Sequence, residues 1–333
     1  MSKAVSVLLI TVGVFLLLIA SLYIAFFRAS PVPASLLIRR IFENSPAKPP
    51  VNYTEIASRI LSYEDIEYPS SSDWNVLDIY TPKEREVNTP VILWVHGGAF
   101  VGGDKSDVRY YAQTLAASGY AVVTMNYLRA PEGEYPTPFY QLNDVYHFLV
   151  SKAEVYHLDM NRIVLAGDSA GAQIVSQASA AITNSEYAGT LSFQMEIPQE
   201  TLQGVLLYCG PYSITQLSET SSSHYWKQLV KMIGWGYFGD KNWQSSPLEV
   251  QTSVINHIGN NFPPAFVTDG NKHSFEPQGR AVVRRLEERG ITVDSLFFEP
   301  EEFTTVHEYQ FIQDDIPSEM SVDATLTFLE KIL

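Results

Sequence analysis

Residues 163–171 read Ile-Val-Leu-Ala-Gly-Asp-Ser-Ala-Gly, and this stretch decides the fold of the chain. The apolar run Ile163–Ala166 predicts a buried strand, and the residues from Ala170 to Ile182 have helical spacing. Between them lies the G-x-S-x-G pattern, in which a tight strand-to-helix turn exposes a serine above a sheet. The dipole of the following helix favours negative charge beside that serine. In this context the pattern predicts that Ser169 is a catalytic nucleophile.

A glycine-rich segment follows an earlier apolar run and offers a place for negative charge. Residues 96–100 read His-Gly-Gly-Ala-Phe. Two consecutive glycines leave backbone N–H groups uncovered, so these groups can point at a developing oxyanion. We expect the N–H groups of Gly97, Gly98 and Ala170 to form an oxyanion hole. His96 itself is expected to have a structural role.

The base that activates Ser169 should lie in a loop beyond the last strand. Of the seven histidines, His307 has this position, just before the predicted C-terminal helix. The acid that holds the imidazole should follow the run Ala265–Thr268, and Asp269 is the first residue beyond it. Asn271 is the alternative, although an amide would orient the histidine without supplying a countercharge. The predicted triad is therefore Ser169, His307 and Asp269.

Short apolar runs alternate with stretches of helical spacing along most of the chain. The predicted strands are Val91–Val95, Ala121–Asn126, Ile163–Ala166, Val205–Tyr208, Ala265–Thr268 and Val293–Phe298. The predicted helices are Asp107–Ser118, Leu142–Lys152, Ala170–Ile182, Phe275–Arg289 and Ser321–Leu333. This alternation predicts an α/β domain with a mostly parallel sheet flanked by helices. Residues 218–260 are rich in Trp and Tyr and poor in strand patterns, so we expect a helical cap there.

An uncharged apolar stretch, Ala4–Phe27, lies near the N-terminus. It is longer than the roughly 20 residues that cross a hydrocarbon core as a helix, and longer than the apolar part of a secretory signal. We expect a transmembrane anchor over residues 1–28, with a cleaved signal as the alternative. Residues 29–60 are expected to form a linker with an amphipathic segment, and residues 61–333 the catalytic domain.

Charge and cysteine content exclude some classes of partner. The formal net charge is −15, which argues against a nucleic-acid partner because such proteins present a basic face to phosphates. The single cysteine, Cys209, excludes an intramolecular disulfide and lies in an apolar run. We expect a buried, unreactive thiol at this position. No residue is predicted to bind a metal.

From about Asp78 to its end, the chain resembles the acetyl esterase and hormone-sensitive-lipase-like α/β-hydrolases. The shared segments are residues 77–82 (LDIYTP), 96–100 (HGGAF), 102–105 (GGDK), 126–131 (NYLRAP), 167–171 (GDSAG) and the loop that holds His307. The resemblance implies the α/β-hydrolase fold and cofactor-free hydrolysis of small, short-acyl esters through an acyl-enzyme. Two features depart from the family: Thr268-Asp269-Gly270-Asn271 replaces its Asp-Pro-Leu acid motif, and the N-terminal membrane segment is additional.

Other functions fit the same motifs. An amide hydrolase of this fold, such as a formamidase or peptidase, would use the same residues. A non-catalytic ligand-binding module could keep the fold, although Ser169 and His307 together argue against it. The aromatic cap could also accept lipid substrates, but aromatic residues at this spacing more often serve packing.

Overall fold

The computed structural model describes residues 3–43, 47–84, 88–217 and 223–333. The start of the predicted cap, residues 218–222, and the first two residues of the predicted anchor lie outside the described residues. An eight-stranded sheet with the order β1-β2-β4-β3-β5-β6-β7-β8 forms the centre of the described part. The strands are β1 (Ile60–Glu67), β2 (Val76–Pro82), β3 (Thr89–Val95), β4 (Ala121–Met125), β5 (Leu158–Asp168), β6 (Leu202–Tyr208), β7 (Ala265–Thr268) and β8 (Val293–Leu296).

The six strands predicted from apolar runs are all present as β3 to β8, and they pair in parallel. Strands β1 and β2 were not predicted, and they pair antiparallel at one edge of the sheet. Polar residues alternate with apolar ones in β1, Ile60–Glu67, and its polar side chains are largely accessible. An edge strand with one solvated face needs no continuous apolar run, which explains why the search for such runs missed it.

Helices cover both faces of the sheet, as the alternating pattern predicted. They are α4 (Arg109–Ala117), α5 (Thr137–Tyr156), α6 (Ala170–Thr183), α11 (Glu276–Glu288) and α12 (Ile316–Ile332). Side chains of α4 and α12 pack in one core with Ile92 and Trp94 of β3. Side chains of α5, α6 and α11 pack in the other core with Val91 and Leu93. Successive residues of a strand point to opposite faces, so β3 contributes to both cores.

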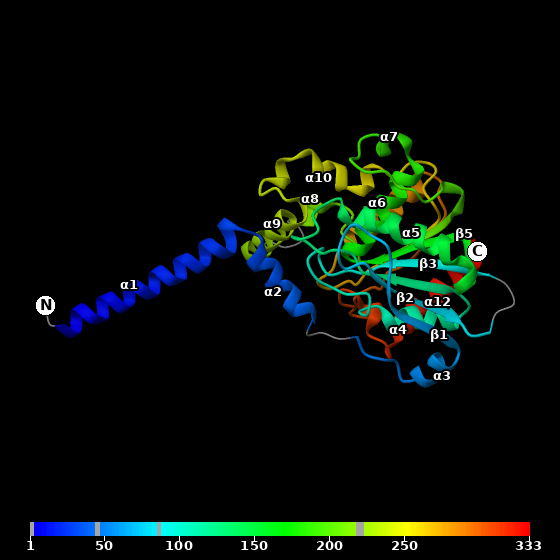
Figure 1. Cartoon of the computed structure of the whole chain (residues 1–333), viewed down its shortest axis with the longest axis horizontal. Coiled ribbons are helices and arrows are strands. Elements are labelled where there is room, and N and C mark those ends of the chain that lie inside the picture. Colours follow the sequence, from blue (N-terminus) through cyan, green and yellow to red (C-terminus); the bar gives the residue numbers. More distant parts are fainter. Residues whose placement is uncertain (1–2, 44–46, 85–87, 218–222) are drawn as a thin grey trace.

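The expected cap lies between β6 and β7 and is helical. It contains α8 (Ile214–Leu217), α9 (His224–Phe238), η3 (Trp243–Ser245), α10 (Pro247–Thr252) and η4 (Val254–Asn256). Ser223 caps the N-terminus of α9 by accepting a hydrogen bond from the N–H of Trp226, and Gly239 ends it in the left-handed conformation. The cap places α9 at the end of the globular domain from which the N-terminal helix projects (Figure 1).

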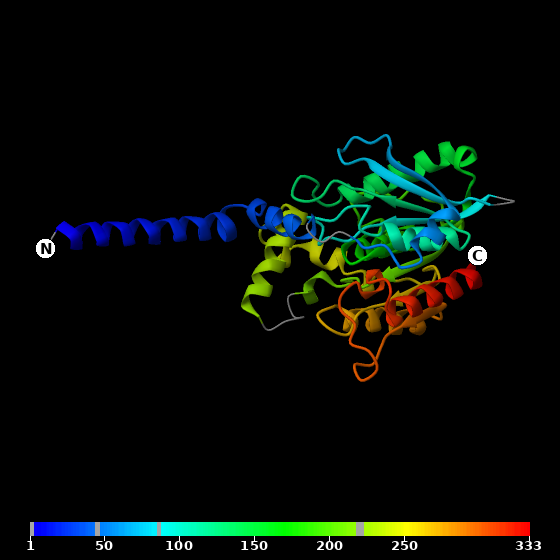
Figure 2. The ribbon, with the colours of Figure 1, turned by 90° about the horizontal axis from the view of Figure 1, so that it is seen from below.

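The N-terminal segment begins with α1 (Lys3–Ile24), which projects away from the domain in both views (Figures 1 and 2). It has a mean hydropathy of 2.8 and no buried residue, so it is long and apolar enough to span a membrane; a signal sequence would meet the same test. A π-helical turn, η1 (Ala25–Ala29), leads into α2 (Val32–Glu43), and the short α3 (Tyr53–Ser58) precedes β1.

Candidate active site

Ser169 lies on the turn between β5 and α6, as the G-x-S-x-G pattern predicted. Its φ of 48° is in a region that residues with a side chain rarely adopt, so the turn holds it in a strained conformation. The flanking glycines are required sterically: a Cβ on Gly171 would collide with the carbonyl oxygen of Val95, and one on Gly167 would meet the backbone of Gly171 at 2.5 Å. The local sequence therefore fixes the position of the serine hydroxyl.

His307 is brought to the serine from the loop before α12. Its Nε2 lies 3.1 Å from Oγ of Ser169, within hydrogen-bond distance. Burial lowers the pKa of His307 to about 4, although 28% of the side chain remains accessible. A neutral imidazole at physiological pH is the form that can accept the serine proton.

Asp269 follows β7 and is buried, but it does not hold the imidazole directly. The hydroxyl of Ser274 lies between them: Oγ is 2.6 Å from Nδ1 of His307 and donates a short hydrogen bond to Oδ1 of Asp269. The expectation that the carboxylate itself holds the imidazole is thus corrected, because the turn that follows Asp269 places the hydroxyl at Nδ1. Sequence reasoning missed Ser274, since a serine five residues beyond the acid carries no recognisable motif.

One arrangement of protons gives a hydrogen-bond partner to each of Ser169, His307, Ser274 and Asp269. The Nδ1–H of His307 donates to Ser274, and the Ser274 hydroxyl donates to Asp269. The Nε2 atom then carries a lone pair and accepts the hydroxyl proton of Ser169. Burial raises the pKa of Asp269 to about 7, while the hydrogen bond from Ser274 opposes this rise. The carboxylate therefore ionises close to neutral pH.

Asn271, the alternative acid position, serves the loop instead. Its side-chain amide donates to the carbonyl oxygens of Phe298 and Phe303, and its oxygen accepts from the N–H of Thr305. Both the nitrogen and the oxygen of the side-chain amide are therefore occupied by hydrogen bonds. They tie the Asp269 turn to the loop that carries His307.

The glycine-rich loop lies beside the serine, but its N–H groups differ in availability. The N–H of Gly97 donates to Oδ2 of Asp168 at 2.8 Å, so it is not free for an oxyanion. In the described part of the chain, the N–H groups of Gly98 and Ala170 have no hydrogen-bond acceptor. The same holds for Ala99, which follows the two glycines and lines the cavity beside Ser169. Ala99 was not predicted, although its position after the glycines was a usable signal.

His96 has the structural role that was expected. It is buried, its Nδ1 is 2.7 Å from the carbonyl oxygen of Gly97, and its ring stacks on Tyr127 at 4.6 Å. Two further histidines are engaged away from the serine: His147 pairs with Glu196, and the ring of His257 stacks on Tyr187.

Two carboxyl groups, Asp168 and Glu308, meet behind the glycine-rich loop. Asp168 accepts hydrogen bonds from Nε1 of Trp94 at 2.7 Å and from Gly97, and it also contacts Glu308. Burial raises the pKa of Asp168 well above its usual range and that of Glu308 to about 7. The two carboxyl groups therefore keep a proton to a higher pH than isolated carboxyl groups do. Oε1 of Glu308 lies 3.7 Å from Nε2 of His307.

An apolar cavity opens beside Ser169 under the cap. Its volume is about 70 Å³, and its walls come from the glycine-rich loop, α8 and α9. Its lining residues are Ala99, Phe100, Ser169, Ala170, Pro211, Ile214, Leu217, Trp226, Val230, Ile233, Gly234, Tyr237, Phe238 and Phe275. The cavity is suited to an uncharged, apolar group attached to the atom that the serine attacks.

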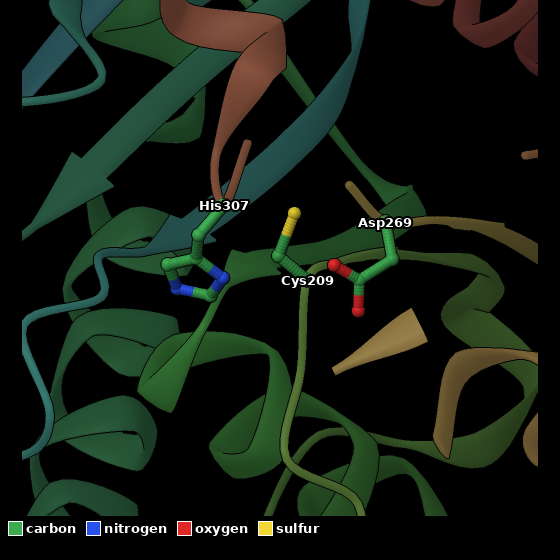
Figure 3. Close-up of side chains that lie close together, drawn as sticks. All are labelled: Cys209, Asp269 and His307. Carbon is green, nitrogen blue, oxygen red and sulfur yellow. The ribbon is translucent and has the colours of Figure 1, made fainter. Parts of the chain in front are cut away.

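Cys209, Asp269 and His307 lie close enough together to be considered as metal ligands (Figure 3). Burial raises the pKa of the Cys209 thiol well above its usual range, so the thiolate that a metal would need is disfavoured. Nδ1 of His307 is already bonded to Ser274. The chemistry of this donor set does not fit a metal site, and the thiol is buried as expected.

Comparisons with known proteins agree with the geometry. A family model described as BD-FAE matches residues 77–283. The chain is 25% identical to a putative alpha/beta hydrolase of Acanthamoeba polyphaga mimivirus over 84% of its own length and 78% of that protein. It is 25% identical to an ethyl acetate hydrolase of Pseudomonas putida over 61% of each protein. Among solved structures, esterase B from Lactobacillus rhamnosis superposes with a TM-score of 0.69 at 19% identity, covering 88% of this chain and 90% of that one, which shows a shared fold.

Proposed function

The chain belongs to the BD-FAE family, and with it to the acetyl esterase and hormone-sensitive-lipase-like α/β-hydrolases that its motifs resemble. On this basis we propose that it is a serine carboxylesterase. Its substrates would be small esters with a short acyl chain. The observation that carries the proposal is the hydrogen-bonded series Ser169–His307–Ser274–Asp269 at the wall of an apolar cavity. Such a series serves nucleophilic acyl transfer.

In the first step, Oγ of Ser169 forms a bond to the ester carbonyl carbon while Nε2 of His307 takes the hydroxyl proton. The carbonyl π electrons move to its oxygen, where the free N–H groups of Gly98, Ala99 and Ala170 would stabilise the charge. In this proposal Ala99 takes the place first expected for Gly97. The ionised Asp269 supports the imidazolium through Ser274.

In the second step, the tetrahedral intermediate collapses and the bond to the alkoxide breaks. The leaving alkoxide takes the proton from Nε2 of His307 and departs as an alcohol. Water then attacks the acyl carbon and gives its proton to His307, and the serine is regenerated with release of the acid. The cavity beside Ser169 would hold either the acyl chain or the alcohol part of the ester.

We also propose that α1, Lys3–Ile24, is a retained membrane anchor. Its length of 22 residues corresponds to about 33 Å of helix, close to the thickness of a hydrocarbon core. The apolar surface of all its turns supports this assignment over a buried core helix.

A panel of p-nitrophenyl esters of graded acyl length and the matching p-nitroanilides tests the proposal. We expect hydrolysis of esters, fastest for short acyl chains, and a rate for anilides at least about 100-fold lower. Comparable rates on anilides would identify an amide hydrolase instead. No turnover of either series, together with failure to react with a fluorophosphonate, would favour a non-catalytic binding module.

A further inference from the structure

Helix α2, Val32–Glu43, buries one face and exposes an apolar second face. Ala34, Ser35 and Ile38 are buried against the domain. On the opposite side, Val32, Leu36 and Leu37 expose 41 to 52% of their surface, and the exposed Arg40 lies among them. An apolar side that a helix leaves in water costs free energy unless something covers it.

Helix α2 lies within residues 29–60, where the sequence predicts a linker with an amphipathic segment, and it is fixed to the domain that follows. Nε of Arg39 donates to the carbonyl oxygen of Val101 at 2.9 Å, and Nη2 donates to that of Ala130 at 3.0 Å. Nη2 also pairs with Glu132 at 2.7 Å. These contacts fix the orientation of the exposed face relative to the active site.

Helix α9 separates α2 from the apolar cavity and touches both. On one side, a Cβ added at Gly236 would lie 3.2 Å from Oγ of Ser35, so the glycine permits close packing of the two helices. On the other side, Val230, Ile233 and Tyr237 line the cavity beside Ser169. Helix α2 is thus one helix away from the space where the substrate would bind.

The membrane helix leads directly into this region. η1, Ala25–Ala29, joins α1 to α2, and Nζ of Lys241, which follows α9, donates to the carbonyl oxygen of Arg28 at 2.6 Å. Both views place α2 and α9 at the end of the domain from which α1 projects (Figures 1 and 2). A bilayer spanned by α1 would meet this end of the domain first.

We propose that α2 is an interfacial helix whose exposed face lies in the bilayer surface, and that the enzyme takes uncharged esters of a short acid and a lipophilic alcohol from the bilayer into the cavity under α9. The inference rests on the proposed esterase activity and on retention of α1. The occupant of the apolar face is lipid, because the face is continuous with a helix of membrane-spanning length. Such a face buries its apolar side chains at the headgroup boundary.

Placement in the bilayer can be tested without any activity measurement. The full chain, carrying an environment-sensitive fluorophore on Leu36→Cys, is inserted into phosphatidylcholine vesicles that contain lipids with quenching groups on their acyl chains. The native Cys209 is buried, which favours labelling at the introduced thiol. We expect strong quenching at position 36 and little at a control label on Val155→Cys, an exposed site on α5. Equal, weak quenching at both positions would overturn the proposal.

The route of the substrate is tested with two esters that share a leaving group. The full chain in vesicles is assayed with p-nitrophenyl acetate, which dissolves in water, and with p-nitrophenyl octanoate, which partitions into the bilayer. Because of its longer acyl chain the octanoate is expected to be the slower substrate, so each variant is compared with the unmodified chain on the same ester. The double variant Leu36→Glu/Leu37→Glu should lower the octanoate rate about tenfold and leave the acetate rate unchanged, because charged side chains leave the interface. The matched control Val150→Glu/Val155→Glu changes two exposed apolar residues of α5 and should affect neither rate.

The possible outcomes separate the two proposals. An unchanged ratio of octanoate to acetate rates in the α2 variant would overturn the proposed route. Absence of hydrolysis of both esters by the unmodified chain would instead refute the esterase proposal, while the quenching result would still decide where α2 lies.

Discussion

The hydroxyl oxygen of Ser274 lies 2.6 Å from Nδ1 of His307, in the place where a triad normally has its carboxylate. Asp269 stands one hydrogen bond further away and acts on the imidazole through the serine. In the proposed mechanism, the charge that stabilises the imidazolium is therefore more remote than in a direct pair, and the orientation of the ring depends on a neutral group. This relationship makes Ser274 a positioning residue with its own testable contribution.

Ser274→Ala should lower kcat by about 10²–10³ and leave KM nearly unchanged, because the imidazole loses its acceptor and its connection to Asp269. Ser274→Thr keeps a hydroxyl and should restore most of the rate. Steady-state kinetics on a p-nitrophenyl ester measures both variants. The neighbouring His273→Asn, at an exposed residue, is the control. An alanine variant as active as the unmodified chain would rule out the relay.

Asp269→Asn should reduce turnover by about 10²–10⁴ while the fold is retained, because an amide supplies no countercharge to the imidazolium. Asn271→Ala should reduce turnover far less, since the side chain of Asn271 bonds to backbone groups of the loop and not to His307. Circular dichroism and kinetics of both variants provide the comparison. A larger loss of turnover in a well-folded Asn271→Ala would assign the acid position to the asparagine.

Glu308→Gln should stabilise the fold increasingly as the pH rises. The folded-state pKa of Glu308 is about 7, whereas an unfolded glutamate ionises near 4.3, so the folded chain retains a proton between these values. The contribution of Glu308 to the free energy of unfolding therefore falls as the pH rises towards the pKa of Glu308 in the folded chain. Glutamine resembles the protonated carboxyl group and does not ionise, so the variant does not lose stability in this way as the pH rises.

Denaturant unfolding at pH 5 and pH 8 measures the effect as a difference between variant and unmodified chain, in which contributions from titratable groups that Glu308 does not contact cancel. The stability difference should be larger at pH 8. Glu302→Gln, at an exposed carboxylate in the same loop, should show no such dependence. A difference independent of pH would show that Glu308 is ionised throughout.

The intact chain should remain in the membrane fraction after carbonate washing, because α1 is apolar on all sides and has a mean hydropathy of 2.8. Mass spectrometry of the N-terminus provides a second readout. A soluble protein that begins near residue 30 would identify α1 as a cleaved signal.

The sheet and the strained turn that carries Ser169 were predictable because their signals are local. Ile163–Ala166 is apolar at every position, and the glycines around Ser169 are required by the crossing of strand and helix. His307 was found by its place in the chain order. The antiparallel edge strand β1 was missed because its burial is one-sided.

The finer details of the site depend on contacts between distant segments, and no local pattern reveals them. Asp168 accepts a hydrogen bond from the N–H of Gly97, which lies in a loop more than 70 residues earlier in the chain. Ser274 acquires its role only when the turn after Asp269 and the loop of His307 meet. The close packing of α2 on α9 depends on the absence of a side chain at Gly236.

The most direct test of the central claim is the reaction of the full chain with a fluorophosphonate, followed by peptide mass spectrometry. We expect one phosphonylated residue, Ser169. Among the described serines, it alone has both a neutral imidazole nitrogen 3.1 Å from its hydroxyl oxygen and an apolar cavity beside it. Ser169→Ala should remove the label and reduce ester turnover by about 10⁴-fold or more. Undiminished ester hydrolysis by that variant, or a label on another residue, would contradict the account.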